Sequence, residues 1–264
     1  MLQCIRVNVN MGFAELVSPF SFACELGLTD LVALMLKDPR IDTNCLDIEG
    51  CTPFLVASMN GLAEVVWLLL EDDRIDVNRP NSLHSSPLWL AAQNGHLMVV
   101  QLLLMSGRDV NTAMKSMGDE QVWANKSAAE IARFQAARDE KDEWETLEEF
   151  TLSKGHGIII AEWIERFEED PEAIRRALRV LPGLRDRLIG EVFALAVFLA
   201  DEFVVLCGHD GESEATRRFF EVAAVLSMDM QMVLCNRVFG SAKELVLSKN
   251  SEPAFQKFAK IWNS

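Results

Sequence analysis

A period of about 34 residues constrains the fold of this chain more than any other feature of its sequence. Prolines, glycines, alanines and leucines recur at this interval: Pro19, Pro53 and Pro87; Gly27, Gly61 and Gly95; Ala23, Ala57 and Ala91; Leu34, Leu68 and Leu102. The string RVNVN at residues 6–10 returns in altered form as RIDTN at 40–44 and RIDVN at 74–78. Self-similarity at such an interval is typical of proteins built by stacking like units. The sequence therefore predicts a repeat protein in which each unit contacts its neighbours.

The residues of one unit predict a tight turn followed by two helices. Gly50 permits the positive φ of a turn, Thr52 is a good N-cap, and Pro53 suits the first position of a helix. Gly61 is placed to end this short helix. The apolar residues of 65–70 predict a second helix, and we expect the RIDVN segment to form a loop whose turn Asn78 ties through its side chain.

The stretches TPFLVASMNGLAEVVWLLL (52–70) and SPLWLAAQNGHLMVVQLLLMSGRDVN (86–111) resemble the ankyrin repeat at many fixed positions. The resemblance implies an all-α solenoid of helix-turn-helix units with hairpin fingers. We expect an ankyrin-repeat domain over residues 1–150, made of a partial unit at 1–12, repeats at about 13–46, 47–80 and 81–113, and a degenerate repeat at 114–150.

The two ends of this array depart from the pattern. At the end, SAAEIA (127–132) stands where a repeat should begin, but later than the period requires, and we expect its helix to continue through the acidic stretch 139–149. At the start, RVNVN matches the tail of a repeat. Either the chain is a shortened form of a longer array, or residues 1–12 form an N-terminal cap.

Residues 151–264 lack the period but keep helical signals, and we expect an α-helical domain of about six helices. Asp170 and Pro171 favour the start of a helix that Pro182 and Gly183 end. Caps for further helices are expected at Ser213, Ser227, Ser241 with Glu244, and Ser251. The segment 228–260 resembles the C-terminal region of ankyrin-repeat proteins of fungi and other eukaryotic microbes, a resemblance that implies no activity.

Composition excludes several classes of function. The formal net charge is −15, and the acidic excess lies mostly in residues 1–150, which disfavours binding to nucleic acid. We expect no secretory signal, and therefore reduced thiols and an intracellular location, cytoplasmic or nuclear. The apolar run 188–207 is interrupted by charges, so we expect no membrane span. No Gly-rich phosphate loop or zinc-like cysteine spacing is present, so we expect no cofactor and no metal.

Two hypotheses of function follow. The first is a protein-protein interaction module, a monomeric adapter that binds a partner protein and is not an enzyme. The ankyrin resemblance implies a concave recognition surface, and its exposed variable positions correspond to Ile48, Glu49, Cys51, Met59, Asn60, Ser82, Leu83, Ser85, Gln93 and Asn94, with Trp89 as an aromatic anchor.

The alternative is an enzyme with a site in the C-terminal helical domain. Cys207, His209 and Glu212 lie close together in the sequence, and a thiol beside an imidazole could act as a nucleophile. A plain loop is the ordinary explanation of so short a motif. We expect His96 to bond backbone groups between repeats and His156 to lie in a loop.

Overall fold

The computed structural model describes residues 10, 17–117, 124–139 and 146–200, together with 219, 222–223, 226–238, 246, 251 and 254–255. The chain divides into two compact units, Met1–Arg175 and Arg176–Ser264. The regular structure of the described residues is helical and contains no β-sheet, which confirms the all-α prediction. A boundary of independently folding domains at residue 150 stays a prediction.

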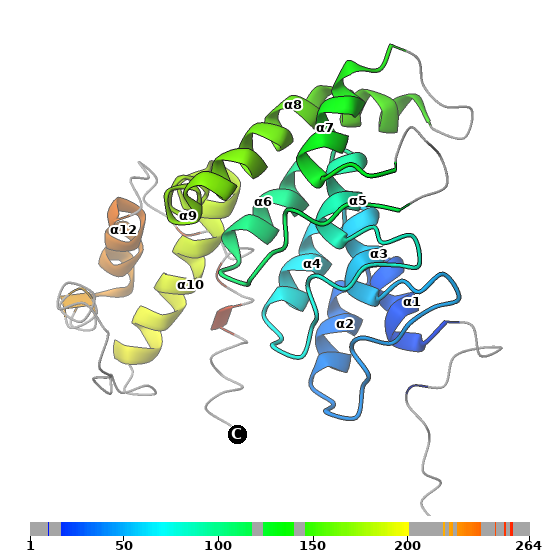
Figure 1. Ribbon diagram of the computed structural model, residues 1–264. Coiled ribbons are helices and arrows are strands. Elements are labelled where there is room, and N and C mark those ends of the chain that lie inside the picture. Colours follow the sequence, from blue (N-terminus) through cyan, green and yellow to red (C-terminus); the bar gives the residue numbers. More distant parts are fainter. Residues whose placement is uncertain are drawn as a thin grey trace, which may run out of the picture. The chain divides into compact units, whose positions relative to one another are not determined.

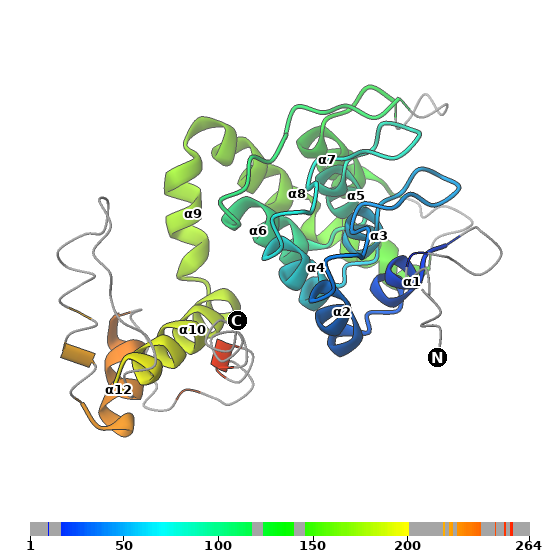
Figure 2. The ribbon, with the colours of Figure 1, turned by 90° about the horizontal axis from the view of Figure 1, so that it is seen from below.

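Three successive helix pairs form the repeat stack. They are α1 (Pro19–Glu25) with α2 (Thr29–Leu36), α3 (Pro53–Met59) with α4 (Ala63–Leu70), and α5 (Pro87–Gln93) with α6 (Leu97–Met105). The first helices contact one another in series, as do the second helices (Figure 1). The hairpin loops project on the side of the first helices, so loops, first helices and second helices form successive layers (Figure 2).

Local signals in the sequence set the ends of these helices. The side chains of Ser18, Thr52 and Ser86 each accept a hydrogen bond from the backbone N–H three residues later, at 3.0, 3.1 and 3.2 Å. Each of these first helices starts with a proline. Gly61 follows the first helix of its unit with a φ of +69°, a value that favours glycine. The predicted caps and C-terminal glycines are therefore confirmed.

The fourth unit begins with α7 (Ala128–Ala137), whose N-terminus is a capping box between Ser127 and Glu130. The prediction that this helix continues through residues 139–149 is wrong. Arg138 has an extended backbone with a ψ of 139°, so α7 ends at Ala137. Residues 140–145 of that stretch lie outside the described residues, and a separate helix, α8 (Leu147–Glu169), follows.

Helix α8 packs against α5, α6 and α7 and takes the place of the second helix of the fourth unit. A β-carbon on Gly95 would lie 2.4 Å from the Cα of Ser153, so α8 closely approaches the turn that ends α5. The prediction that His156 lies in a loop is wrong. His156 lies within α8, and its Nδ1 is 2.8 Å from the carbonyl oxygen of Gly95. This contact holds α8 against the third repeat.

The remaining described helices are α9 (Pro171–Arg179), α10 (Pro182–Ala200) and α12 (Met228–Val238). The predicted boundaries at Asp170 and Pro182 are confirmed, and the Asp170 carboxylate accepts a hydrogen bond from the backbone N–H of Ala173 at 3.0 Å. In the second unit Ile189, Phe193 and Cys235 form a small apolar core between α10 and α12.

Ser227 directly precedes α12, as predicted for a cap, and its carbonyl accepts a hydrogen bond from Gln231. The caps predicted at Ser213 and at Ser241 with Glu244 lie outside the described residues. None of the helices that the structure describes is both long and apolar enough to cross a membrane.

Candidate functional site

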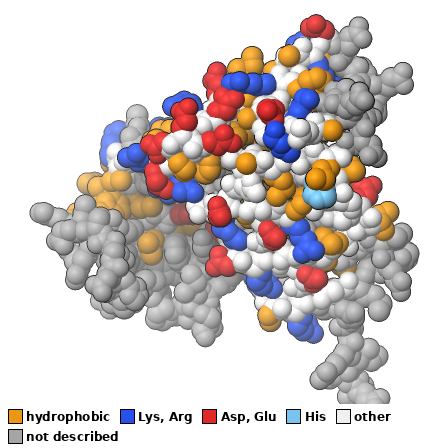
Figure 3. Space-filling view, viewed as in Figure 1, with side chains coloured by type: hydrophobic (Ala, Val, Ile, Leu, Met, Phe, Trp, Pro, Cys, Tyr) orange, Lys and Arg blue, Asp and Glu red, His pale blue; other side chains and the backbone are white. Residues whose placement is uncertain are grey.

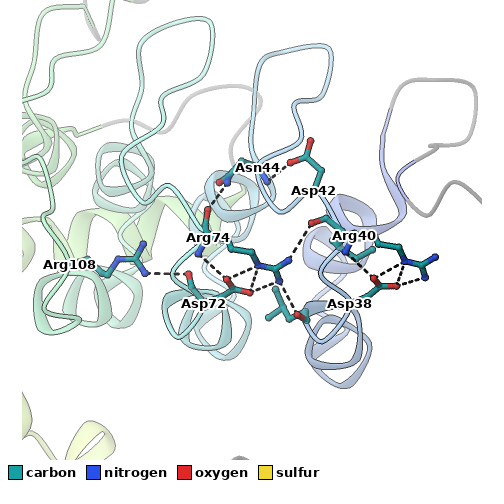
Figure 4. Close-up of polar contacts among 9 residues, drawn as sticks. Asp38, Arg40, Asp42, Asn44, Asp72, Arg74 and Arg108 are labelled. Carbon is teal, nitrogen blue, oxygen red and sulfur yellow. Dashed lines mark hydrogen bonds and ion pairs between the residues drawn. The ribbon is translucent and has the colours of Figure 1, made fainter. Parts of the chain in front are cut away.

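A ladder of asparagines joins successive repeats. The amide nitrogen of Asn44 donates to the carbonyl oxygen of Arg74 at 2.6 Å (Figure 4). Its side-chain oxygen accepts from the backbone N–H of Asp76 at 2.9 Å. Asn78 and Asn10 make the same pair of bonds with the repeat that follows each of them. Asn78 therefore links two repeats, rather than tying its own turn as we predicted.

Arginines form a second set of contacts between repeats. The guanidinium of Arg74 pairs with Asp72 at 2.7 Å and donates to the carbonyl oxygen of Leu36, at the end of α2, at 2.9 Å (Figure 4). Arg108 likewise reaches back one repeat and donates to the carbonyl oxygen of Ile75 at 2.6 Å. The hydrogen bond from Arg74 lowers the pKa of the Asp72 carboxyl, so this carboxyl stays ionised and holds the arginine in place.

The predicted role of His96 is confirmed. Its Nε2 lies 2.8 Å from the carbonyl oxygen of Met59 in the preceding repeat. The same oxygen accepts a hydrogen bond from the side chain of Asn94 at 2.9 Å. The asparagines, the arginines and this histidine thus hold the stack together, and their polar atoms are directed at neighbouring repeats.

Three of the predicted partner-binding residues are buried, so the expectation that Cys51 and Ser85 are exposed is wrong. Cys51 and Trp89 are each 3 % exposed, and Ser85 is equally buried. The indole N–H of Trp89 donates to the carbonyl oxygen of Lys126 at 2.9 Å, which anchors the segment that enters α7. The next unit of the stack covers these three residues, so they contribute to contacts between repeats. The sequence pattern of one repeat does not show this burial.

The other predicted residues reach the surface. Exposed side chains on the hairpins are Ile48, Glu49, Ser82 and Leu83, and Asn60 is exposed at the end of α3; Met59, Gln93 and Asn94 are half-buried. The structure therefore brings these predicted residues to the hairpins and to the ends of the first helices. Hydrophobic side chains lie among charged ones on the face shown in Figure 3.

The sequence-based choice omitted three exposed residues of the same surface. Met117 lies one repeat period after Leu83, while Glu25 and Leu26 lie one period before Met59 and Asn60. All three are exposed. The 34-residue period is the signal that identifies them, since they are equivalent to Leu83, Met59 and Asn60 in neighbouring repeats.

The thiols of the repeats are poor nucleophiles. Burial raises the pKa of Cys24 to about 12 and that of Cys51 to about 11, so both thiols keep their protons at neutral pH. The four cysteines among the described residues form no disulfide with one another. Within the same residues no group of three His, Cys, Asp or Glu side chains is placed to hold a metal ion. The candidate enzyme site at Cys207, His209 and Glu212 lies outside the described residues.

Comparison with known proteins identifies the repeats. Residues 20–114 match the family model of ankyrin repeats, in three copies, and the helix pairs of the structure agree with that match. A search of the curated proteins found no match to this chain. Ankyrin repeats are generally protein-protein interaction modules. The matched range does not include residues 228–260, so the resemblance of that segment to microbial ankyrin-repeat proteins stays a prediction.

Proposed function

We propose that this chain, which carries three ankyrin repeats over residues 20–114, is an adapter that binds a partner protein through its hairpins and first helices. In this proposal it acts as a monomer in the cytoplasm or nucleus, without nucleic acid and without catalysis. The acidic net charge of −15 supports a protein partner over a nucleic acid.

One observation carries the proposal: the contacts that build the stack repeat from unit to unit, whereas the exposed residues differ. Asn44 and Asn78 make the same bonds, and Arg74 and Arg108 both reach back to the preceding repeat. At equivalent positions that reach the surface of neighbouring repeats, Ile48 corresponds to Ser82, Glu49 to Leu83, and the half-buried Met59 to Gln93. Surface residues that differ from repeat to repeat, carried by repeats that are held together in the same way, favour recognition of one particular partner.

The test is capture of a partner from the native cell by the full-length protein and its variants. The hairpin variant combines Leu83→Ala, Met59→Ala and Gln93→Ala, and leaves the buried Trp89 unchanged. We expect it to retain its thermal stability and to lose most of the captured partner, since truncating one interface anchor typically costs about 2 kcal/mol of binding free energy.

The control variant changes exposed apolar residues of second helices, Leu34→Ala in α2 and Met98→Ala in α6. We expect this control to capture as much partner as the unchanged protein. If the control loses the partner and the hairpin variant keeps it, the proposed surface is wrong.

The double change Cys207→Ala and His209→Ala distinguishes the enzyme hypothesis from the adapter proposal. Under the adapter proposal this variant still captures the partner. If this variant loses the cellular activity of the protein, while the hairpin variant remains active and retains its partner, the enzyme hypothesis takes the place of the adapter proposal.

A further inference from the structure

Three successive hairpins each present an exposed apolar side chain. Ile48 is 75 % exposed, Leu83 is 51 % exposed and Met117 is 69 % exposed. We call these three residues the fingertip row. A single exposed hydrophobic residue is ordinary, but a row of them on consecutive repeats is a feature that marks interaction sites.

Backbone hydrogen bonds place the members of the fingertip row next to one another. The N–H of Ser82 donates to the carbonyl oxygen of Glu49 at 3.1 Å, which joins the residue after Ile48 to the residue before Leu83. The N–H of Met117 donates directly to the carbonyl oxygen of Leu83 at 2.8 Å. The three residues of the row therefore lie on adjacent hairpins that are joined by backbone hydrogen bonds.

Two of these three hairpins, those of Ile48 and Leu83, are held in one conformation by their own side chains. The carboxylate of Asp47 accepts from the backbone N–H groups of Glu49 and Cys51 at 2.9 and 2.8 Å. Asn81 makes the corresponding bonds in the next hairpin, to Leu83 and Ser85, at 3.1 and 2.9 Å. Because these turns are ordered before a partner arrives, binding costs little conformational entropy.

The repeats around the fingertip row carry an excess of acidic side chains. Residues 17–117 contain twelve Asp and Glu residues and six Lys and Arg residues. Three of the acids are paired within the stack: Asp38 with Arg40, Asp72 with Arg74, and Asp73 with Arg108. Glu25 and Glu49 are exposed, and no ion pair between described residues includes either of them.

We propose that the fingertip row docks a basic segment of the partner protein, whose apolar side chains lie on Ile48, Leu83 and Met117 while its lysines or arginines face Glu49. This inference rests on the proposed function, because it names the chemistry of the partner at the same surface. Apolar contact supplies the affinity, while Glu49 and the net acidic charge of the repeats favour a cationic segment and speed its approach.

Three fluorescent synthetic peptides of about 12 residues, long enough when extended to cross several hairpins, test the two requirements separately. The first alternates leucine with lysine, the second leucine with glutamate, and the third serine with lysine. Binding to the full-length protein is measured by fluorescence anisotropy at low and at high salt. We expect only the leucine–lysine peptide to bind, and its affinity to fall at high salt because salt screens exposed charges.

Variants of the full-length protein locate the binding. Combined Ile48→Ser, Leu83→Ser and Met117→Ser should weaken binding of the leucine–lysine peptide by about 10-fold or more, and Glu49→Gln should weaken it at low salt only. The matched control, Leu34→Ser with Met98→Ser, should bind like the unchanged protein. All variants change exposed side chains, so unaltered thermal unfolding is the check that they remain folded.

Each other outcome overturns the inference in a recognisable way. Equal binding of the serine–lysine peptide, or unchanged binding by the fingertip variant, would mean general attraction to acidic surface and no apolar site. Tighter binding of the leucine–glutamate peptide would mean that the partner segment is not basic. If no peptide binds but the hairpin variant still loses the native partner, the basic-segment inference fails and the adapter function stands.

Discussion

A β-carbon at Gly157 would lie 2.3 Å from the carbonyl oxygen of Ala132. Helix α8 therefore passes so close to α7 that only glycine fits at this point of contact. Gly155 lies in the same helix, two residues earlier, and a β-carbon there would meet no atom within 4 Å. These two glycines differ in what surrounds them and not in their helical position, which makes them a matched pair.

The change Gly157→Ala should therefore destabilise the protein. Overpacking a close contact between backbones costs about 1–3 kcal/mol of the free energy of unfolding. Gly155→Ala should leave stability unchanged or raise it by about 0.5–1 kcal/mol, because alanine is the better helix former. Urea unfolding of both variants measures the difference. Equal stability of the two would show that α8 does not press on α7 at this residue.

Removing the side chain of Asn78 should weaken the stack. Asn78→Ala loses two hydrogen bonds to the following repeat, each worth about 0.5–1.5 kcal/mol. Among the described residues, the side chain of Asn111 makes a hydrogen bond only within its own loop, where it accepts from the backbone N–H of Ala113. Asn111→Ala is therefore the control. We expect thermal unfolding to shift clearly for Asn78→Ala and little for Asn111→Ala. The reverse order would refute the ladder as a source of stability.

Truncation should reveal that α8 belongs to the repeat stack. A chain that ends at residue 150 lacks nearly all of α8 and leaves the buried faces of Ile131 and Ala132 uncovered, whereas a chain that ends at residue 175 keeps them covered. We expect residues 1–175 to stay monomeric and to unfold cooperatively, and residues 1–150 to aggregate, since a large apolar patch becomes exposed.

Size-exclusion chromatography and circular dichroism would measure both fragments. A stable, monomeric 1–150 fragment would favour the boundary at residue 150 that we predicted from the sequence.

Acid should remove the contribution of the Asp72–Arg74 pair. The pKa of Asp72 is lowered in the folded protein by the hydrogen bond from Arg74, so the pair contributes stability above the ordinary carboxyl pKa of 3.8. This contribution is lost as the pH falls below 3.8 and through the lower pKa of the folded state. Asp72→Asn should therefore have a lower Tm than the unchanged protein at pH 7, and the difference should shrink below about pH 4.

Thermal unfolding between about pH 2.5 and 7 would test this, with Asp30→Asn as a control at an exposed residue in the first turn of α2. A Tm difference for Asp72→Asn that is constant over this range would contradict the assignment.

The repeat architecture and the ends of most helices could be predicted from local sequence patterns. A cap such as Thr52 and a positive-φ residue such as Gly61 act on backbone groups a few residues away, so neighbouring residues are enough to predict them. The same is true of the helix boundary at Pro182, which follows from the missing N–H of proline. The hairpin positions of Ile48 and Leu83 also followed from the period, because equivalent residues of like units occupy equivalent places.

Which of the predicted surface residues remain exposed depends on packing between repeats, which the sequence pattern does not show. Cys51 occupies a position that the pattern marks as surface, yet it is buried. Trp89, predicted as an anchor for a partner, instead bonds the segment around Lys126, which belongs to the next unit of the chain. The course of α8 and the contact of His156 with Gly95 likewise depend on the close approach of α8 to α7 and to the turn after α5. Glycines permit this approach, but their presence in the sequence does not predict it. These features depend on close packing between segments that are far apart in the sequence, and such segments come into contact only in the folded chain.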